Sequence, residues 1–289
     1  MRYLGPDDLR AALPMSSAIG AMREAFRDDR ETPQRVLLGS SLFMAGKVGS
    51  RTGIKVVSIT PGDPAGIVVV FDGRGHPIGL VDGPTLTAIR TGAAAGLATR
   101  LLAKPDASTL AMLGAGAMAR DLIEAVIAVR PITRILVWSR SRDRAERLAR
   151  QVGGEAVSDA NEAVGHADVV TTATPAHIPL FRDSSLPESV HINAIGAFTP
   201  EMAEIPPETV RRAFVAVDDI AAASEEAGDL IQAQRSPDAT IGDLLTHRSK
   251  PSSPITLFKS VGVASQDIAA AARALATAAR EGLGVLLEP

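Results

Sequence analysis

The sequence contains no cysteine, which excludes disulfides, thiolate nucleophiles and cysteine-ligated zinc in a single step. Aromatic residues are scarce, with one Trp, one Tyr and seven Phe, so we expect a core built mainly from Ala, Val, Leu and Ile. No apolar run reaches the length of about 18 residues that a membrane span needs. The formal net charge of −3 argues against a nucleic-acid partner, which requires a concentrated basic face.

What remains is the composition of an ordinary globular protein, with 46% hydrophobic and 22% charged residues among 289. A chain of this length suits two packed units. The first eight residues lack the apolar core of a signal peptide. Together with the absence of cysteine, this favours a reducing compartment, and we expect a cytoplasmic protein.

The hydrophobic pattern changes along the chain. Residues 1–35 have helical spacing, residues 36–80 form short β-type runs separated by glycine turns, and residues 84–104 are helical again. The middle part predicts an antiparallel meander. Strands and helices then alternate, which implies parallel strands with crossover helices in a doubly wound α/β sheet. The predicted strands are residues 109–113, 134–138, 168–172, 190–194, 213–217 and 254–259, and an Ala-rich helix over residues 264–281 follows and is expected to pack back on the first part.

The strongest local motif is G-x-G-x-x-A at residues 114–119, directly after a predicted strand and at the start of a predicted helix. Gly114 allows the tight turn, Gly116 lets the backbone approach a pyrophosphate, and Ala119 allows close packing of helix on strand. The helix N-terminus offers N–H groups to the phosphates. The alternative is a glycine turn without a ligand, but the strand–helix alternation behind it favours a dinucleotide site.

The end of the second strand indicates which dinucleotide binds. An acidic residue at this point holds the ribose hydroxyls in NAD enzymes, but here the strand is followed by Ser139, Arg140, Ser141 and Arg142, and the first carboxylate is Asp143. Hydroxyls and guanidinium groups suit a 2′-phosphate. We therefore predict NADP(H) in preference to NAD, the alternative being that the arginines are solvated charges at a helix start.

Other catalytic patterns are absent from the sequence. The five histidines have no metal-ligand spacing, and H-E-x-x-H and G-x-S-x-G do not occur. We predict no metal site. The adjacent Asp218 and Asp219 close a predicted strand, and we expect them to cap the helix that follows.

Several stretches distributed over nearly the whole chain resemble the ornithine cyclodeaminase/mu-crystallin family. The most specific is D-G-x-x-L-T-x-x-R-T, which begins at Asp82. The others are residues 32–36, 53–57, 61–63, 168–175, 196–204 and 258–262, together with the glycine turn. The resemblance implies a Rossmann-type doubly wound sheet (residues 105–262) inserted in an α+β substrate-binding and dimerisation domain (residues 1–104 plus 263–289). It also implies a homodimer.

The resemblance places Arg35, Lys55 and Arg90 at the substrate. The chemistry agrees, because guanidinium groups bind carboxylates bidentately and burial lowers the pKa of a lysine toward a proton-transfer role. The alternative for Lys55 is the solvent face of its strand. The cofactor-binding residues that we expect are Arg90, Thr91, Gly114, Ala115, Gly116, Ala117, Met118, Ser139, Arg140, Ser141, Thr172 and Ser260.

One departure from the family pattern bears on the reaction. Phe198 stands where members that oxidise ornithine or alanine carry an Asp, counted back from Glu204. Phenylalanine cannot take a proton, and the pattern resembles the ketimine reductases instead. We predict NADPH-dependent reduction of a small imine, Δ1-pyrroline-2-carboxylate or Δ1-piperidine-2-carboxylate. The alternatives are an ornithine cyclodeaminase, an alanine- or opine-type amino-acid dehydrogenase, and an NADPH-dependent small-molecule binding protein of the mu-crystallin type.

Overall fold

The computed structural model describes residues 1–27, 29–58, 60 and 65–288. Its contacts divide the chain into two compact units, Met1–Ala94 with Gly262–Pro289, and Ala95–Val261. Helix α3 (Gly83–Leu102) crosses this division, whereas the boundary predicted after residue 104 lies just beyond the helix. The motif at residues 61–63 lies outside the described residues. No helix of the described segments is long and apolar enough to cross a membrane.

The first unit is built on an eight-stranded sheet in the order β16-β1-β7-β6-β5-β4-β2, with β3 paired to β4. The predicted meander is confirmed, because β3 to β7 pair antiparallel in sequence order. The prediction of helix throughout residues 1–35 is wrong at both ends, where short strands gain their hydrogen bonds from distant neighbours. The strands are β1 Arg2–Leu4, β2 Arg30–Glu31, β3 Val36–Leu38, β4 Ser41–Val48, β5 Arg51–Ser58, β6 Gly66–Phe71, β7 Pro77–Asp82 and β16 Val285–Leu286.

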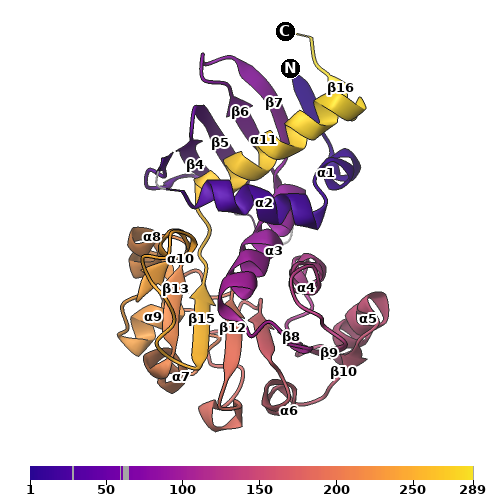
Figure 1. Ribbon diagram of the computed structural model, residues 1–289. Helices are drawn as coiled ribbons and strands as arrows, with labels where there is room; N and C mark the ends of the chain where they lie inside the picture. The colour runs from indigo at the N-terminus through magenta and orange to yellow at the C-terminus, as the bar shows by residue number, and fades with distance from the viewer. Residues whose placement is uncertain (28, 59, 61–64, 289) are drawn as a thin grey trace. The chain divides into compact units, whose positions relative to one another are not determined.

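Helices cover one face of this sheet. The C-terminal helix α11 (Ala264–Glu281) packs against β4, β5, β6 and α2 (Met15–Ala25), and α1 (Pro6–Ala12) lies beside its far end (Figure 1). Burial of Ile268, Ala271 and Leu275 fixes the helix on the strands. The prediction that the last helix packs on the first part of the chain is confirmed.

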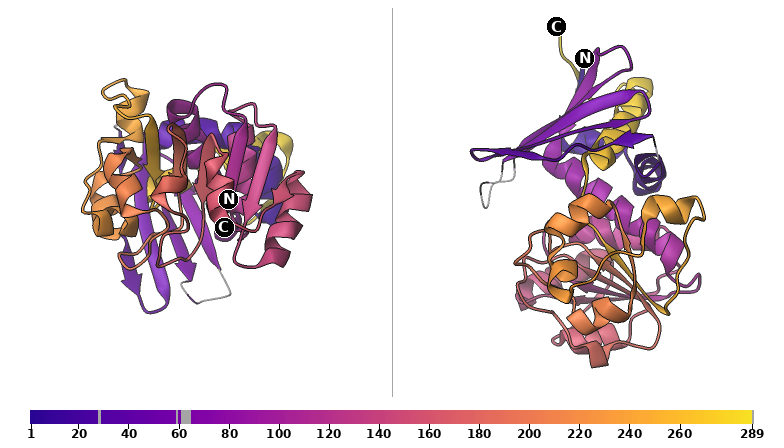
Figure 2. Two further views of the ribbon diagram at one scale, coloured as in Figure 1. Left: turned by 90° about the horizontal axis from the view of Figure 1, so that it is seen from below. Right: turned by 90° about the vertical axis from the view of Figure 1, so that its left-hand side faces the viewer.

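The register of β5 decides where Lys55 lies. Lys55 pairs with Met44 on one side and with Val68 on the other, and all three are buried. Since side chains alternate between the faces of a sheet, Lys55 lies on the face covered by α11. The solvent-face alternative is wrong. Its neighbours Ile54 and Val56 lie on the opposite, half-exposed face, which the right-hand view of Figure 2 shows without helices of this unit.

The second unit is a parallel sheet in the order β10-β9-β8-β11-β12-β15-β13-β14. Its first five strands in chain order follow the 3-2-1-4-5 arrangement of dinucleotide-binding folds, so the predicted α/β class is confirmed. The strands are β8 Thr109–Leu113, β9 Arg134–Trp138, β10 Glu155–Ala156, β11 Val169–Thr172, β12 Val190–Ala194, β13 Phe214–Val217, β14 Ala239–Thr240 and β15 Ile255–Lys259. The helices are α4 Ala119–Ile127, α5 Arg142–Val152, α6 Ala160–Gly165, α7 Pro207–Arg212, α8 Ile220–Glu226, α9 Gly228–Ala233 and α10 Ile241–Leu245, with a 3-10 turn at Asp183–Ser185.

Candidate active site

The glycine turn lies between β8 and α4, at the carboxyl end of the parallel sheet. Gly114 has φ +121°, and a Cβ there would lie 2.6 Å from the Ala173 carbonyl oxygen, so glycine is required. A Cβ at Gly116 would meet nothing within 4 Å. No side chain caps the nine-residue helix α4, whose N-cap is Met118. Open space above a glycine beside an uncapped helix N-terminus fits a pyrophosphate.

The segment after β9 holds the residues predicted to select the cofactor. Ser141 caps α5 by accepting a hydrogen bond from the Arg144 amide at 3.4 Å. Arg142 is exposed and donates to Glu146 at 2.8 Å. Arg140 is also exposed, and among the described residues no side chain pairs with it. Arg140 is therefore the better candidate of the two for a ligand phosphate.

Two of the predicted cofactor-binding hydroxyls are committed to buried carboxylates. Thr172 donates to Glu204 at 2.8 Å, and Ser260 donates to Asp218 at 2.8 Å. Each hydroxyl has one proton, so either could only accept a hydrogen bond from a cofactor. The expected cap is formed by Asp219, which accepts from the Ala222 amide, whereas Asp218 instead holds the end of β15.

Glu204 joins the loops after β11 and β12. Its fully buried carboxylate accepts from the Thr172 hydroxyl, from the Thr174 amide and hydroxyl, and from the Gly196 amide, at 2.6–2.8 Å. Its own amide donates to Asp229, which pairs with Lys259 at 3.0 Å. Burial raises the pKa of Glu204, and the nearby Lys259 ammonium opposes that rise. This network, which the sequence did not predict, fixes three strand ends at the edge that carries the glycine turn.

The first unit contains the predicted substrate-binding cations. The Lys55 ammonium donates to Thr87 Oγ1 at 2.7 Å and to Asp267 Oδ1 at 3.1 Å. The same Asp267 oxygen accepts from Arg90 Nε at 3.1 Å. Lys55 and Arg90 are 4% and 7% exposed, and Asp267 is fully buried. A strand (β5), a helix (α3) and the C-terminal helix (α11) thus contribute one charge each to a single buried cluster.

Gly262 brings Arg35 to the same cluster. Its carbonyl accepts from Arg35 Nη2 at 2.6 Å. Its φ is +76°, and a Cβ there would lie 2.7 Å from Arg90 Nη1, so a larger residue would displace the guanidinium. Arg90 also donates through Nη1 to Gln266 at 2.7 Å. The structure therefore brings Arg35, Lys55 and Arg90 together as predicted, and Thr91 lies buried beside Arg90 on α3.

The charges of the cluster shift one another's pKa values. Burial lowers the pKa of Lys55 to about 8, against the opposing pull of Asp267 and with the help of Arg90. Burial alone would raise the pKa of the Asp267 carboxyl, but Arg90 and Lys55 outweigh it and bring the pKa below its ordinary value. At neutral pH the cluster therefore contains a carboxylate beside a lysine that can lose its proton readily. Such a lysine can act as a general acid.

Asp267 is the charged residue of the cluster that sequence reasoning missed. It stands in an Ala-rich helix, where an acid near the N-terminus is ordinarily explained by the helix dipole. One signal was available. Two cations predicted to lie buried in one site demand a buried counter-charge, and α11 was the helix expected to pack there.

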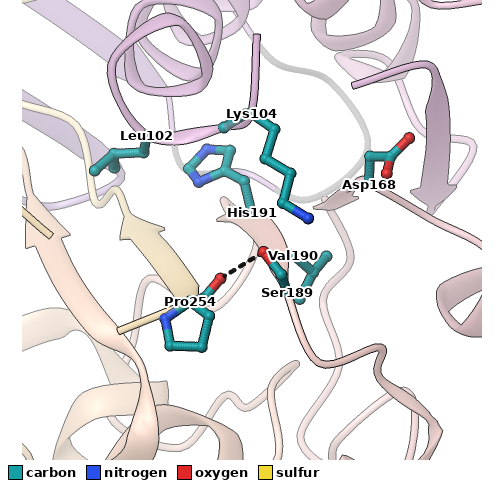
Figure 3. A pocket seen from close by; sticks show the side chains of 8 residues that line it. Leu102, Lys104, Asp168, Ser189, Val190, His191 and Pro254 are labelled. Carbon is teal, nitrogen blue, oxygen red and sulfur yellow. Dashed lines mark hydrogen bonds between the residues drawn. The ribbon is translucent and has the colours of Figure 1, made fainter. Parts of the chain in front are cut away.

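A cavity of about 20 Å³ lies at the opposite, amino edge of the parallel sheet, lined among others by Lys104, Asp168 and His191 (Figure 3). It has room for about one water molecule, too little for an amino acid. Burial lowers the pKa of His191 to about 3, and its ring nitrogens contact Thr256 and Asn193. His191 is therefore a neutral, satisfied core histidine.

The parallel sheet of the second unit, with its glycine turn, and the buried Lys55–Asp267–Arg90 cluster of the first unit are features of an α/β enzyme of the dinucleotide-binding class. Residues 47–281 match the model of the ornithine cyclodeaminase/mu-crystallin family. The chain belongs to this family. The predicted family, fold class and assignment to the oxidoreductases are confirmed.

Relatives of the chain have named activities. It is 35% identical over 261 residues to the Delta(1)-pyrroline-2-carboxylate reductase of Bacillus cereus, covering 82% of this chain and 80% of the relative. It is 34% identical over 215 residues to the ketimine reductase mu-crystallin of Mus musculus, covering 73% and 68%. The solved structure of Thermococcus litoralis Delta(1)-pyrroline-2-carboxylate reductase in complex with NADH and L-proline has a TM-score of 0.93 at 28% identity, covering 99% of this chain and 100% of that one.

Proposed function

We propose that the protein reduces the C=N bond of a small cyclic imine carboxylate, Δ1-pyrroline-2-carboxylate or Δ1-piperidine-2-carboxylate, to the cyclic amino acid. The observation that carries the proposal is the buried Lys55 ammonium, which lies beside Arg90 and shares a carboxylate with it. An imine nitrogen needs a proton donor, and a carboxylate needs a cation. The activities for which the two sequence relatives are named support the same reaction class.

The hydrogen-bond donors of Arg90 and Lys55 suit different parts of the substrate. A guanidinium has five N–H groups, and Arg90 uses Nε for Asp267 and one Nη1 hydrogen for Gln266. Its remaining donors suit the substrate carboxylate, and Arg35, held by the Gly262 carbonyl, adds a second guanidinium charge to the cluster. Lys55 protonates the imine nitrogen. When bound, the reduced nicotinamide supplies the hydride to the imine carbon.

We propose NADPH as the preferred cofactor. Arg140, exposed and without a partner side chain in the described part of the chain, supports a contact with a 2′-phosphate. The turn at Gly114 and Gly116 and the start of α4 would hold the pyrophosphate. The Thermococcus litoralis relative was solved with NADH, so the preference has to be measured rather than transferred.

The residue at position 198 supports reduction over amine oxidation. Phe198 follows β12 and is 51% exposed, and it offers no group that could take a proton from a substrate amine. In this proposal an amino-acid dehydrogenase or cyclodeaminase activity would require a base from elsewhere.

The test is oxidation of NADPH by the purified protein with a panel of cyclic imines, with keto acids plus amines, and with ornithine. We expect turnover with a cyclic imine carboxylate and formation of proline or pipecolate, identified by amino-acid analysis. Turnover only with a keto acid plus an amine would favour an opine-type dehydrogenase. Tight NADPH binding without turnover of any imine would favour the binding-protein alternative.

We also propose that the protein is a homodimer joined through the first unit. The uncovered face of its sheet carries half-exposed Ile54, Val56 and Val69 and exposed Ile67, and β3 exposes Val36–Leu38 at 59–70%. Apolar area of this kind marks an interaction surface. Light scattering should give twice the chain mass, and Ile67→Lys should shift it toward the monomer; a monomeric wild-type protein would refute the proposal.

A further inference from the structure

We infer that Asp267 is a positioning residue that directs one N–H of Lys55 toward the imine nitrogen and keeps its ammonium group charged at neutral pH. The inference rests on the proposed imine reduction. It gives α11 a part in the reaction besides its packing on the sheet, and it makes the state of Lys55 depend on a residue more than 200 positions away in the sequence.

The hydrogen bonds of Lys55 leave one direction open. An ammonium group has three N–H donors and no acceptor. Thr87 Oγ1 receives one of them at 2.7 Å and Asp267 Oδ1 receives another at 3.1 Å. Thr87 donates its own proton to the Gly83 carbonyl at 2.7 Å, so its hydroxyl must accept from Lys55. Among the described residues no group receives the third N–H, which remains available to a substrate.

Asp267 is itself held in place. Its Oδ1 accepts from Arg90 Nε as well as from Lys55, each at 3.1 Å. Rotation of the carboxylate away from Lys55 would therefore also break the bond to Arg90. Because Asp267 is fully buried on α11, water does not compete for this oxygen, and both cations keep a fixed orientation.

The charges around Lys55 assign a second role to the same carboxylate. The ionisable groups that face Lys55 are Arg35 before β3, Arg90 on α3 and Asp267 on α11. Burial and both arginines lower the pKa of Lys55, and Asp267 alone among them raises it. Without this carboxylate the pKa of Lys55 would be lower still, and a smaller fraction of the lysine would carry the proton that the imine needs.

The proton from Lys55 and the hydride from the cofactor together account for the reduction of the imine. The π bond of C=N breaks as the carbon gains a hydride from the reduced nicotinamide and the nitrogen gains a proton from Lys55 Nζ. The imine is reduced to a secondary amine, and the nicotinamide is oxidised. Lys55 is left as the neutral amine and regains its proton from water. Asp267 remains a carboxylate throughout.

The first test measures the titration of the Lys55 side chain and does not depend on catalytic activity. The chain has five lysines, so NMR of the protein with ¹³C-labelled lysine is tractable, and Lys55→Met assigns the resonance. We expect Lys55 to titrate near pH 8. In Asp267→Asn it should titrate at a pH lower by roughly one unit or more, the usual effect of one close opposite charge. The exposed Lys47, paired with Glu31, is the internal control and should not move. An unshifted Lys55 titration would overturn the inference.

The second test uses the rate. Because the donor must be protonated, kcat/KM for the imine should fall above about pH 8, and in Asp267→Asn this fall should begin at lower pH. A merely structural role would lower the rate equally at every pH. In the Lys55→Met background, Asp267→Asn should change kcat less than twofold, because the proton donor on which Asp267 acts is gone, and any loss through Arg90 should appear in KM.

The remaining outcomes are also decisive. If Asp267→Asn does not fold, Asp267→Glu keeps the charge and displaces it: the titration of Lys55 should stay within half a unit of the wild type while kcat falls. A titration in Asp267→Glu that moves down by a unit or more would refute the inference. If no imine is reduced but Lys55 shifts as expected, the proposed function fails and the coupling of Asp267 to Lys55 stands.

Discussion

The selection of the cofactor by Arg140 gives the sharpest prediction. A hydrogen bond to a charged group contributes about 1.5–3 kcal/mol, which corresponds to roughly 10- to 150-fold in affinity. Arg140 is exposed, so solvent screening favours the lower end of this range. We expect Arg140→Ala to weaken NADPH binding by about tenfold and NADH binding, which involves no 2′-phosphate, by less than twofold.

The chain offers both a matched control and a reporter for this experiment. Arg142 is a similarly exposed arginine two positions further on but is bonded to Glu146, so Arg142→Ala should change neither affinity by more than about twofold. Trp138, the single tryptophan, ends β9, and its fluorescence should respond to cofactor binding. Equal affinities of the wild-type protein for the two cofactors, or equal losses in Arg140→Ala, would refute the reasoning.

Four further predictions concern the substrate cluster, the reaction and the Glu204 network. Lys55→Met should lower kcat by roughly 10²–10⁴ with NADPH affinity unchanged; a change in KM alone would make Lys55 a carboxylate anchor instead. Gly262→Ala should raise the KM for the imine, because the new Cβ would lie 2.7 Å from Arg90 Nη1; unchanged kinetics would mean that Arg90 does not bind substrate. Glu204→Gln should lower the free energy of unfolding by about 1–3 kcal/mol and with it the thermal midpoint, because an amide cannot accept from all four groups that donate to the Glu204 carboxylate. An unchanged midpoint would contradict the network. Ornithine with NAD or NADP should yield neither ammonia nor proline, since Phe198 supplies no base; detectable product would place a base elsewhere.

The elements with a strong local pattern were predictable from the sequence. The parallel strands of the second unit and the final helix follow from the spacing of hydrophobic residues, and the glycine turn follows from its motif. These are patterns within a short stretch of sequence. The strands β1, β10 and β14 were not predicted, since they have two or three residues. A strand of that length is defined by its hydrogen-bonding neighbour and not by its own sequence.

Lys55 shows where local information ends. Its neighbours Ile54 and Val56 are apolar. Because side chains alternate between the two faces of a strand, this local pattern favours a buried apolar pair and a lysine that faces solvent. The structure has the opposite arrangement, because α11 covers the lysine face and the apolar pair lies on the uncovered face. Only the counter-charge on α11 explains a buried lysine there. Asp267 was missed for the same reason, since its partners are 177 and 212 positions away.

Asp267 is distant in sequence from Lys55 and Arg90 because residues 95–261 form the second unit between them. Arg90 lies on α3 shortly before the chain passes into the second unit at Ala95, and Gly262 is the first residue after it returns. Asp218 binds the Ser260 hydroxyl and the Val261 amide, so the return of the chain is fixed immediately before Gly262. Gly262 then accepts from Arg35 and leaves room for Arg90, and α11 begins two residues later with Asp267 in its first turn. Both passages of the chain between the units therefore lie close in sequence to cluster residues, Arg90 on α3 and Gly262 before α11, and within the first unit Arg90 and Asp267 meet in one hydrogen bond.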